Sequence, residues 1–377
     1  MTVPVSQEYE AVRKTAREYA QNELKPIYRE YNEKGEFPYD LVEDMAEVGL
    51  RGIMVPVEYG GVGMDMLSHA IVMEEVSAVW PSAGIKMDEG LMRYLRMFGT
   101  EEQKERYLPK LCSGEYVDAI ALSEPDYGSD FAGIETTAER DGDEYVLNGS
   151  KMWVTNAGKS DLMVVTAKTD QPERHRGISL FLIETQNNDG CTVEPGIDMM
   201  GFDASESHEV VLDDCRVPEE NLLGEENGGF YHTMKMLEEN RVSVAARGLG
   251  IAVGAYDASK QYITEREQFG KKIGEFQAIQ HKIADMAVQI ENSKHLVYNA
   301  ARLCDDGEPF DTEASMAKLY ASEAAHDVAS EAVQIHGGYG YTKEFPVQMF
   351  FRDAKGIEIY EGTSEIQKNV IAKNVME

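Results

Sequence analysis

The sequence predicts a multidomain α+β protein in which a central β domain lies between two helical domains. Apolar residues recur at helical spacing up to about residue 112, and short alternating runs typical of strands fill residues 116–217. The helical spacing returns after Gly228-Gly229 and holds to the end. We therefore expect an N-terminal helical domain (1–115), a central antiparallel β-barrel-like domain (116–225) and a C-terminal four-helix bundle (226–377).

The chain is strongly acidic along its whole length. Among its 377 residues, 36 are Lys or Arg and 68 are Asp or Glu, so the formal net charge is −32. Such a surface repels nucleic acids and anionic membranes. Because the acidic residues are dispersed rather than gathered in a tail, we expect a protein adapted to high salt, in which ions screen the self-repulsion. The alternative is a mesophilic protein that merely has a low pI.

The cysteines indicate a reducing compartment. The four of them are widely separated and show no zinc-ligand spacing, so no metal site or disulfide framework is expected: Cys112, Cys191, Cys215 and Cys304. The N-terminus lacks a basic region followed by an apolar run, and no stretch approaches 18 consecutive apolar residues. We therefore expect a cytoplasmic protein without a membrane span.

Five helices are expected in the N-terminal domain. The first should be kinked or restarted at Pro26, and the last should begin at Thr100 as N-cap. A glycine-rich segment at 55–63 could cradle a phosphate, but it follows no strand pattern and lacks the P-loop Lys-Ser/Thr, so we interpret it as a turn. The expected helices are Gln7–Tyr31, Tyr39–Val48, Leu67–Val79, Gly90–Phe98 and Glu101–Leu111.

Eight short strands are expected in the central domain, as in a small antiparallel barrel or sandwich. Asp141-Gly142-Asp143 and Asn148-Gly149 have the chemistry of hairpin turns. The expected strands are Val117–Leu122, Thr136–Arg140, Tyr145–Asn148, Lys151–Thr155, Leu162–Thr169, Ile178–Ile183, Thr192–Pro195 and Glu209–Val217.

The last domain should contain four long helices, Phe230–Arg266, Glu275–Asp306, Asp311–Gly337 and Ser364–Val375. The third carries a face of small side chains that predicts close packing: Ala314, Ala317, Ala321, Ala324, Ala325, Val328, Ala329 and Val333. The fourth should begin with a capping box, because Gln367 follows Ser364 by three residues.

Glu361 is the candidate catalytic group. It precedes Gly362 on a turn just before the last expected helix, where a carboxylate could serve as a positioned general base. The alternative is a Glu that merely favours the helix start electrostatically. Burial should raise its pKa, while the helix N-terminus should lower it, and the sequence leaves this balance open.

Two segments of the central domain are candidates for ligand binding. In Ser123–Asp130, glycine and serine could bring N–H groups and hydroxyls to an anion, although a plain β-turn is the alternative. Trp153 and Thr155 would share one face of a strand and would suit a planar heterocycle with hydrogen-bonding edges. The alternative for Trp153 is a core position.

In the last domain, Arg266 ends a helix and could reach a phosphate. Gly337-Gly338 follows another helix, where a C-cap is the alternative. Gly248–Gly254 is rejected as a dinucleotide-binding fingerprint, because its spacing is wrong and it follows a helical pattern.

These motifs together resemble the acyl-CoA dehydrogenases, flavoproteins of fatty acid and amino acid breakdown, over nearly the whole chain. Individually each motif is weak, but six occur in the family's order and near its spacing. They are Glu58–Gly61; Ser123-Glu124-Pro125 with Gly128-Ser129-Asp130; Asn148–Asn156; Arg266 with Phe269-Gly270; Gln334 with Gly337-Gly338; and Arg352–Lys355 through Ile359–Gln367.

The resemblance implies a homotetramer with FAD between the β domain and the C-terminal helices, and with part of each FAD site coming from a neighbouring subunit. It implies Glu361 as the catalytic base, because Asn240 occupies the position where some members carry that base instead. The implied cofactor-binding residues are Leu122, Ser123, Gly128, Ser129, Trp153, Thr155, Arg266, Phe269, Gln277, Gln334, Gly337, Gly338, Thr363 and Glu365. The implied substrate-binding residues are Ser129, Glu238, Arg241, Tyr360 and Gly362.

The implied reaction is α,β-desaturation of an acyl-CoA thioester to a trans-2-enoyl-CoA. Glu361 would take the α-proton, a hydride would leave the β-carbon for the flavin, and electrons would pass to an electron-transfer flavoprotein. Alternatives are an acyl-CoA oxidase that uses oxygen, a flavin-dependent monooxygenase, and a non-enzymatic CoA-binding or scaffold protein. The chain departs from the usual small or apolar residues of the family at Asp126, Tyr127, Lys86, Asp88 and Glu89, which would face either an unusual acyl group or solvent.

Overall fold

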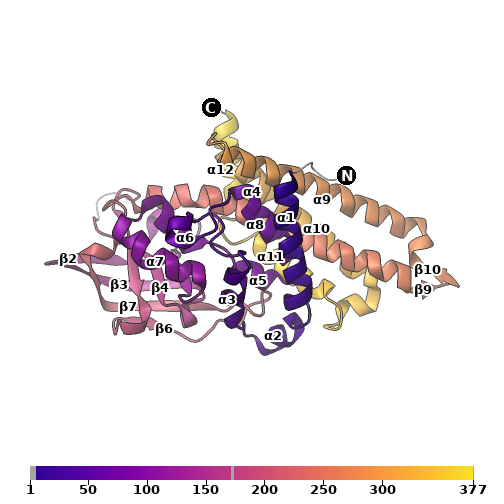
Figure 1. The fold of residues 1–377 in the computed structure, drawn as a ribbon, viewed down its shortest axis with the longest axis horizontal. Helices are drawn as coiled ribbons and strands as arrows, with labels where there is room; N and C mark the ends of the chain where they lie inside the picture. Colours follow the sequence, from indigo (N-terminus) through magenta and orange to yellow (C-terminus); the bar gives the residue numbers. More distant parts are fainter. Residues whose placement is uncertain (1–5, 171–173, 377) are drawn as a thin grey trace.

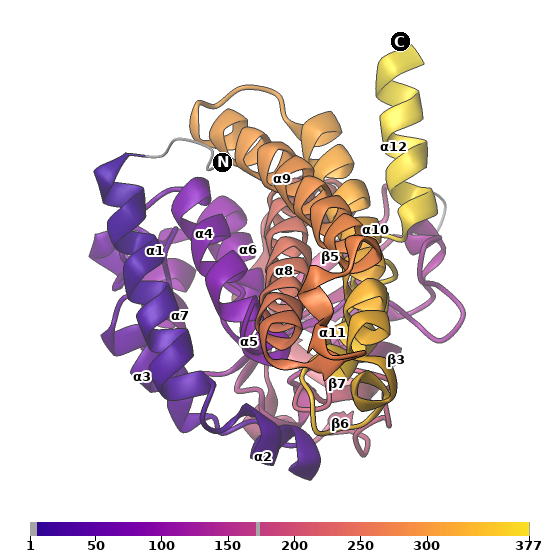
Figure 2. The ribbon, with the colours of Figure 1, turned by 90° about the vertical axis from the view of Figure 1, so that its right-hand side faces the viewer.

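The computed structural model describes residues 6–170 and 174–376. The molecule is elongated, with the β domain at one end and long helices that extend to a small hairpin at the other end (Figure 1). The N-terminal helices lie along the side of the long helices rather than forming a separate body (Figures 1 and 2).

The first predicted helix is broken into three segments. Helix α1 (Gln7–Tyr19) continues as a short π-helical segment, Ala20–Leu24, and α2 (Tyr28–Lys34) starts after Pro26. The predicted break at Pro26 is confirmed, since proline lacks the N–H that the helix ladder needs. The predicted end at Tyr31 is wrong, because α2 continues to Lys34 and is ended by Gly35 with φ 69°.

The other N-terminal helices agree closely with the prediction. As predicted, Thr100 caps the last of them, since its Oγ1 accepts from the Gln103 backbone N–H at 3.2 Å. The glycine-rich segment 55–63 is a turn region, as predicted, and a short additional helix begins at Pro81, where no N–H is required. The helices are α3 (Asp40–Glu47), α4 (Met66–Ser77), α5 (Pro81–Lys86), α6 (Gly90–Phe98) and α7 (Glu101–Ser113).

The central domain is one eight-stranded sheet in the order β6-β7-β3-β2-β4-β5-β8, with β1 paired to β4. Most neighbouring strands are antiparallel, as predicted, but β4 pairs in parallel with β1 and with β2. The strands are β1 (Asp118–Ala121), β2 (Thr137–Asp141), β3 (Glu144–Thr155), β4 (Leu162–Lys168), β5 (Ile178–Glu184), β6 (Cys191–Val193), β7 (Ser207–Pro218) and β8 (Leu222–Leu223).

One of the two predicted hairpin turns is wrong. The turn at Gly142 joins β2 to β3, with Asp141 opposite Glu144, as predicted. Gly149, in contrast, lies inside the continuous strand β3, where the pairing with β7 changes register. Its φ is 151°, and a Cβ there would lie 2.5 Å from Thr136 Oγ1. Glycine therefore allows a bulge at this position rather than a chain reversal.

The C-terminal domain is built around α8 (Gly229–Glu265), which packs against α10 (Asp311–His336), α9 (Gln277–Asp305) and α4. Most of the predicted small-residue face of α10 is buried, including Ala317, Ala321 and Val328. Two further helices follow, α11 (Val347–Ile357), which was not predicted, and α12 (Ser364–Met376). The hairpin β9–β10 (Glu267–Gln268 and Lys271–Lys272) connects α8 to α9.

The N-terminal and C-terminal helices share one hydrophobic core. Residues such as Val76 in α4, Leu249 in α8 and Ala325 in α10 belong to the same buried cluster. Side chains from segments that are distant in sequence can therefore meet in the interior. Figure 2 shows the ribbons of the helices involved, with α8 lying between α4 and α10. Within the described residues, no helix is long and apolar enough to cross a membrane.

Candidate functional site

Glu361 lies on the turn between α11 and α12, as the sequence predicts, and its φ of 55° shows that the turn is sharp. The next carbonyl, of Gly362, accepts from Lys318 Nζ at 2.7 Å and from Gln367 Nε2 at 2.9 Å. Two different helices therefore hold this turn in place. A positioned carboxylate is what general-base catalysis requires.

The predicted capping box at the start of α12 is wrong. The helix begins at Ser364 itself, so the cap is the preceding residue, Thr363. Thr363 Oγ1 accepts from the Ile366 backbone N–H at 3.3 Å. The hydroxyl of Ser364 has no hydrogen-bond partner within the described part of the chain. Thr363, a predicted cofactor residue, thus also helps to fix the turn that carries Glu361.

The environment of Glu361 raises the pKa of its carboxyl group. Burial is the main cause, and the nearby carboxylate of Asp88 adds to it. Arg247, a hydrogen bond with Asn240 and Lys318 act in the opposite direction but do not outweigh burial. The balance that the sequence left open is therefore settled in favour of a raised pKa. A carboxylate with a raised pKa is a better proton acceptor than an ordinary surface Glu.

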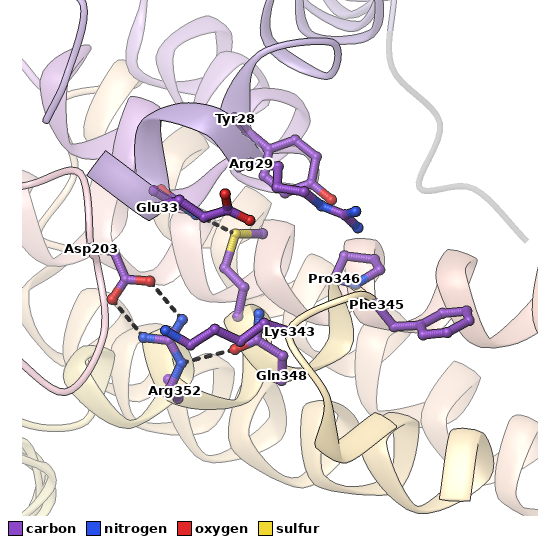
Figure 3. A pocket seen from close by; sticks show the side chains of 11 residues that line it. Tyr28, Arg29, Glu33, Asp203, Lys343, Phe345, Pro346, Gln348 and Arg352 are labelled. Carbon is purple, nitrogen blue, oxygen red and sulfur yellow. Dashed lines mark hydrogen bonds and ion pairs between the residues drawn. The ribbon is translucent and has the colours of Figure 1, made fainter. Parts of the chain in front are cut away.

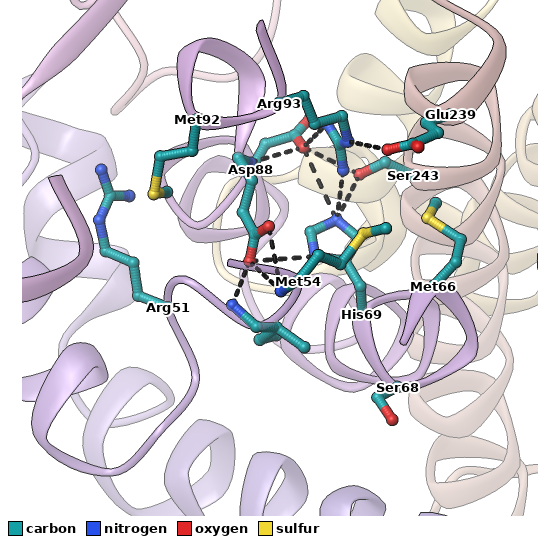
Figure 4. Close-up of polar contacts among 12 residues, drawn as sticks. Arg51, Met54, Met66, Ser68, His69, Asp88, Met92, Arg93, Glu239 and Ser243 are labelled. Carbon is teal, nitrogen blue, oxygen red and sulfur yellow. Dashed lines mark hydrogen bonds and ion pairs between the residues drawn. The ribbon is translucent and has the colours of Figure 1, made fainter. Parts of the chain in front are cut away.

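Asp88 belongs to a buried charged cluster at the meeting of α4, α6 and α8 (Figure 4). Its Oδ1 accepts from Arg93 Nη1 at 2.8 Å and from Ser243 Oγ at 3.1 Å, and its Oδ2 lies 2.9 Å from Arg247 Nη1. Burial alone would raise the pKa of Asp88, but the two arginines hold it well below its usual range. Asp88 therefore carries a negative charge beside the candidate base.

Of the other four unusual residues, Lys86 and Glu89 belong to the N-terminal domain, and Asp126 and Tyr127 lie on a loop of the β domain. Lys86 and Glu89 are buried: Lys86 Nζ donates to the Tyr39 hydroxyl at 3.2 Å, and Glu89 accepts from the Met54 backbone N–H at 3.3 Å. Asp126 is exposed, and the partly buried Tyr127 donates its hydroxyl to Glu135 at 2.8 Å. Only Asp88 among the five is placed to act on Glu361.

The first test of this electrostatic coupling is a pH profile of Asp88→Asn. The base must be ionised, so the rate should fall as pH decreases through the raised pKa of Glu361. Removing the Asp88 charge, and leaving Arg247 without its partner, should lower that pKa. We expect the acidic limb of substrate-dependent flavin reduction to move to lower pH. Asp126→Asn, on the surface, is the matched control, and an acidic limb that stays in place in Asp88→Asn would disprove the coupling.

The segment Ser123–Asp130 is held by a buried ion pair. Tyr127 N–H donates to Glu124 O at 3.1 Å, which is the β-turn expected as the alternative reading. The carboxylate of Glu124 lies 2.7 Å from Lys151 Nζ and accepts from the Thr136 backbone N–H at 3.0 Å. Lys151 also donates to the Leu122 carbonyl at 3.2 Å. These contacts of Glu124 and Lys151 therefore fix the inner side of the turn, whereas its outer edge, which we call the open rim, faces solvent.

The open rim of this segment consists of Gly128 and Ser129, which are exposed. A Cβ at Gly128 would meet no atom within 4 Å, so the backbone there is free to approach a ligand. Ser123 lies at the inner end, where its carbonyl accepts from the Met152 N–H at 2.9 Å. This contact joins the segment to the strand that carries Trp153.

Trp153 is a surface residue, not a core residue. Its side chain is 54% exposed, whereas the other tryptophan, Trp80, is 0% exposed. Its φ is 63°, at a point where β3 changes register against β7 between Lys151 and Val154. A bulge of this kind re-aims a side chain, so the strand alternation expected between Trp153 and Thr155 is interrupted. An exposed aromatic ring on a strained bulge is a candidate stacking surface.

A second group of predicted cofactor residues lies at the other end of the molecule, by the hairpin β9–β10 (Figure 1). Arg266 and the pair Gly337-Gly338 line a cavity of about 470 Å³. Neither glycine would bring a Cβ within 4 Å of another group. Phe269 is 94% exposed and has φ 52°. Gln277 and Gln334 are also exposed there, at the start of α9 and near the end of α10.

The predicted substrate residues differ in their contacts. Arg241 is buried and ion-paired with Asp311, while Glu238 is paired with Lys235 at 2.5 Å. Tyr360 and Gly362 flank Glu361, and the Tyr360 hydroxyl has no partner within residues 6–170 and 174–376. Glu365 is exposed on the first turn of α12.

Sequence reasoning missed several residues that surround Glu361. Arg93, Arg247 and Lys318 are buried cations in helices whose other inward positions are mostly apolar or small. A cation at an inward position of such a helix could have indicated these residues in the sequence, because a buried charge must have a partner. Arg93 also donates to Asn240 Oδ1 at 3.0 Å, and Asn240 in turn is hydrogen-bonded to Glu361.

Another pocket, between α2 and α11, is too small to be the site. Figure 3 shows Arg352 and Asp203 joined across it, with Nη1–Oδ1 and Nη2–Oδ2 distances of 2.6 and 2.7 Å. Its volume is about 30 Å³, which is room for little more than one water molecule. The described residues contain no cluster of His, Cys, Asp and Glu that could hold a metal ion.

Known proteins match this chain over its whole length. Models of the acyl-CoA dehydrogenase N-terminal, middle and C-terminal domains match residues 6–115, 119–215 and 227–376. The chain is 43% identical to a short-chain specific acyl-CoA dehydrogenase of Clostridium acetobutylicum, with 100% of both chains covered. It is 43% identical to the CarC subunit of the caffeyl-CoA reductase-Etf complex of Acetobacterium woodii, over 97% of this chain and 98% of that one. The solved butyryl-CoA dehydrogenase of Megasphaera elsdenii has a TM-score of 0.97 at 38% identity, with 100% of both chains covered.

Proposed function

This chain belongs to the acyl-CoA dehydrogenase family, and we propose that it desaturates an acyl-CoA thioester to the trans-2-enoyl-CoA with Glu361 as the base. The observation that carries this proposal is the position of Glu361, a carboxylate of raised pKa on a fixed turn. The test is a panel of acyl-CoAs mixed anaerobically with the purified protein, with a dye acceptor, while flavin absorbance is followed. Absence of bleaching across the panel, or a colourless protein without FAD, would favour the non-enzymatic alternative.

FAD is the cofactor of this family, and the chain offers two surfaces that fit it. An exposed Trp153 ring beside the open rim at Gly128-Ser129 suits a flat ring and a polar edge. The cavity at Gly337-Gly338, with the Arg266 guanidinium at its edge, suits a phosphate-bearing group. We propose that Leu122, Ser123, Thr155, Thr363 and Glu365 complete the first surface, and that Phe269, Gln277 and Gln334 complete the second. When bound, FAD supplies an acceptor for the hydride.

The chain itself supplies the proton chemistry. The raised pKa of Glu361 favours transfer of the thioester α-proton to its carboxylate. Within the described residues, the Glu361 N–H donates to no backbone carbonyl, so it is free to bind a thioester oxygen as charge develops there. Lys318 and Gln367 keep this N–H and the carboxylate in a fixed relation, and Arg241, Glu238 and Ser129 are proposed to hold the CoA portion.

We propose that the electrons pass to an electron-transfer flavoprotein, as the name of the Acetobacterium woodii relative suggests for that protein. The reaction would serve fatty acid β-oxidation in the cytoplasm, which agrees with the four cysteines being free thiols. The oxidase alternative is tested by re-oxidation of the reduced protein. Rapid re-oxidation by air, without need of the flavoprotein, would favour the oxidase.

We propose a homotetramer in which each FAD site is completed by a neighbour, with domains at 1–115, 116–225 and 226–377. Two facts support this: one group of cofactor residues belongs to the β domain whereas the other lies by the hairpin β9–β10, at the end of the molecule away from that domain, and the end that carries Phe269 also exposes Tyr341 (91%). Arg266→Ala should therefore weaken both flavin retention and oligomerisation, measured by the flavin-to-protein ratio and by light scattering. A variant of unchanged size and flavin content would refute the cross-subunit site, and Arg140→Ala, in β2 at the β-domain end of the molecule, serves as the control.

The net charge of −32 supports the proposal that the protein is adapted to high salt. The screening distance grows from about 3 Å at 1 M salt to about 30 Å at 0.01 M. Repulsion within and between subunits should then increase, and we expect loss of flavin and of the oligomer as KCl is lowered. Thermal unfolding at molar and millimolar KCl is the measurement, and equal midpoints would argue for a merely acidic mesophilic protein.

A further inference from the structure

The charged cluster around Asp88 reaches the candidate base from two directions. On one side, Arg93 contacts both Asp88 and Asn240, and Asn240 is hydrogen-bonded to Glu361. On the other side, Arg247 is paired with Asp88 and lies over the Tyr360 ring, with its Cζ 5.5 Å from the ring centroid. An acyl chain whose α-carbon lies at Glu361 would therefore extend toward an ion pair.

Arg247 is buried and only partly satisfied. It is 3% exposed, and its Nε has no hydrogen-bond partner among the residues that the structure describes. The side chain runs past Gly84 of α5, since a Cβ at Gly84 would lie 3.5 Å from Arg247 Cδ. The Tyr360 hydroxyl, next to Glu361 in the chain, is likewise buried without a partner. The Arg247 Nε and the Tyr360 hydroxyl are thus two unpaired hydrogen-bond donors, and their side chains lie against each other next to Glu361.

Asp88, in contrast, has little accepting capacity left. Its Oδ1 accepts from Arg93, Ser243 and the Glu89 backbone N–H, and its Oδ2 is paired with Arg247. The Arg247 Nε and the Tyr360 hydroxyl are therefore donors that Asp88 does not satisfy, and Gln367 Oε1 is an unpaired acceptor beside the Glu361 backbone among the described residues. Buried donors require an acceptor, and the ligand group that complements them is an oxygen.

We propose that the preferred substrate has an acyl chain with a hydroxyl or carboxylate oxygen at the end distant from the thioester, and that Arg247 and Tyr360 bind this oxygen. The proposal rests on the proposed acyl-CoA dehydrogenase function and specifies its substrate class. A plain alkyl chain would place carbon against the Arg247 Nε and the Tyr360 hydroxyl. A site built to hydrogen-bond a substrate group discriminates strongly against an analogue that lacks the group.

The experiment compares three CoA thioesters of equal length with the flavin-loaded protein: valeryl-, 5-hydroxyvaleryl- and glutaryl-CoA. Anaerobic flavin bleaching gives the rates, and calorimetric titration gives the affinities independently of turnover. We expect the apparent second-order rate constant for at least one oxygenated thioester to exceed that for valeryl-CoA by about 100-fold or more. Sites that hydrogen-bond a substrate group can discriminate by larger factors than this. The hydroxyl and carboxylate arms show which oxygen is accepted.

Arg247→Gln should reduce or reverse this preference. Because that change leaves Asp88 short of one partner, Asp88→Asn/Arg247→Gln is a second variant without the unpaired charge, and the same loss of preference is expected. Lys260→Gln, on the exposed surface of α8, is the matched control and should keep the parental preference.

A parental protein that bleaches with valeryl-CoA at least as fast as with both oxygenated thioesters would overturn the substrate proposal and leave the proposed function intact. An oxygenated preference that persists in both Arg247 variants would also overturn it, because another group would then bind the oxygen. Failure of every acyl-CoA, butyryl-CoA included, to bleach the flavin would instead contradict the proposed function itself, and the substrate proposal with it.

Discussion

Glu361→Gln should retain its fold and its flavin but lose substrate-dependent flavin reduction. The amide keeps the size and hydrogen-bonding shape of the side chain, and the contacts of Lys318 and Gln367 are to the neighbouring backbone, so they are unchanged. The amide cannot accept the α-proton. General-base catalysis contributes about 10²–10⁴-fold, and we expect a loss at the upper end of that range because Glu361 is partly buried and its surroundings raise the pKa of its carboxyl. Stopped-flow bleaching with a good substrate is the measurement.

The matched control for this variant is Glu358→Gln. Glu358 is three residues earlier and is paired with Lys355 at 2.7 Å and with His326, so it should change the bleaching rate only modestly. If Glu361→Gln bleaches within about tenfold of the parent, below the usual contribution of a general base, the base lies elsewhere. Asp88 and Glu239 would then be the next carboxylates to test, although both are committed to arginines.

Lys151→Met should destabilise the protein and release the flavin. Lys151 is fully buried, and its Nζ is the charge partner of Glu124, which lies under the turn at Ser123–Ser129. Removing one member of a buried pair leaves the other charge unpaired, at a cost of about 3–5 kcal/mol. Denaturant unfolding measures the loss of stability, and the flavin-to-protein ratio after dialysis measures the effect on the turn.

The double variant Glu124→Gln/Lys151→Met is the control for this interpretation. It has no unpaired buried charge, so much of the lost stability should return. Flavin retention should recover less, because the neutral side chains no longer fix the turn through the Thr136 N–H and the Leu122 carbonyl in the same way. Stability of Lys151→Met within about 1 kcal/mol of the parent would show that the pair is not essential.

The sequence was most informative where a pattern is long and local. The helices α8 and α10 were predicted to within about one residue at each end, because their apolar spacing persists over many turns. The six-residue helix α5 was missed, since fewer than two turns give little periodic signal, and α11 was missed although it is longer than the correctly predicted α6. Asn148-Gly149 has hairpin chemistry, but the long pairing of β3 with β7 outweighs it and turns Gly149 into a bulge.

The candidate site was predictable only in part. The Glu361 turn could be located from local chemistry and family resemblance, but its electrostatics depend on residues 273 and 114 positions earlier, Asp88 and Arg247. These residues meet because the N-terminal and C-terminal helices share one core, and no spacing rule in the sequence encodes that contact. The cap of α12 was mispredicted for a different reason. A helix start is predicted from sequence only to within one or two residues, and a shift of one residue makes Thr363 rather than Ser364 the capping residue.

The central claim, that Glu361 removes an α-proton as the β-carbon loses hydride, is tested most directly by isotope effects on anaerobic flavin bleaching. The preferred acyl-CoA is deuterated at C2, at C3 or at both, and each is mixed with the flavin-loaded protein under single-turnover conditions. We predict that deuterium at either position slows bleaching in the parent protein, and that the enoyl-CoA product accumulates in step with it. Bleaching that is indifferent to deuterium at C2, or that proceeds without formation of an enoyl-CoA, would contradict this account.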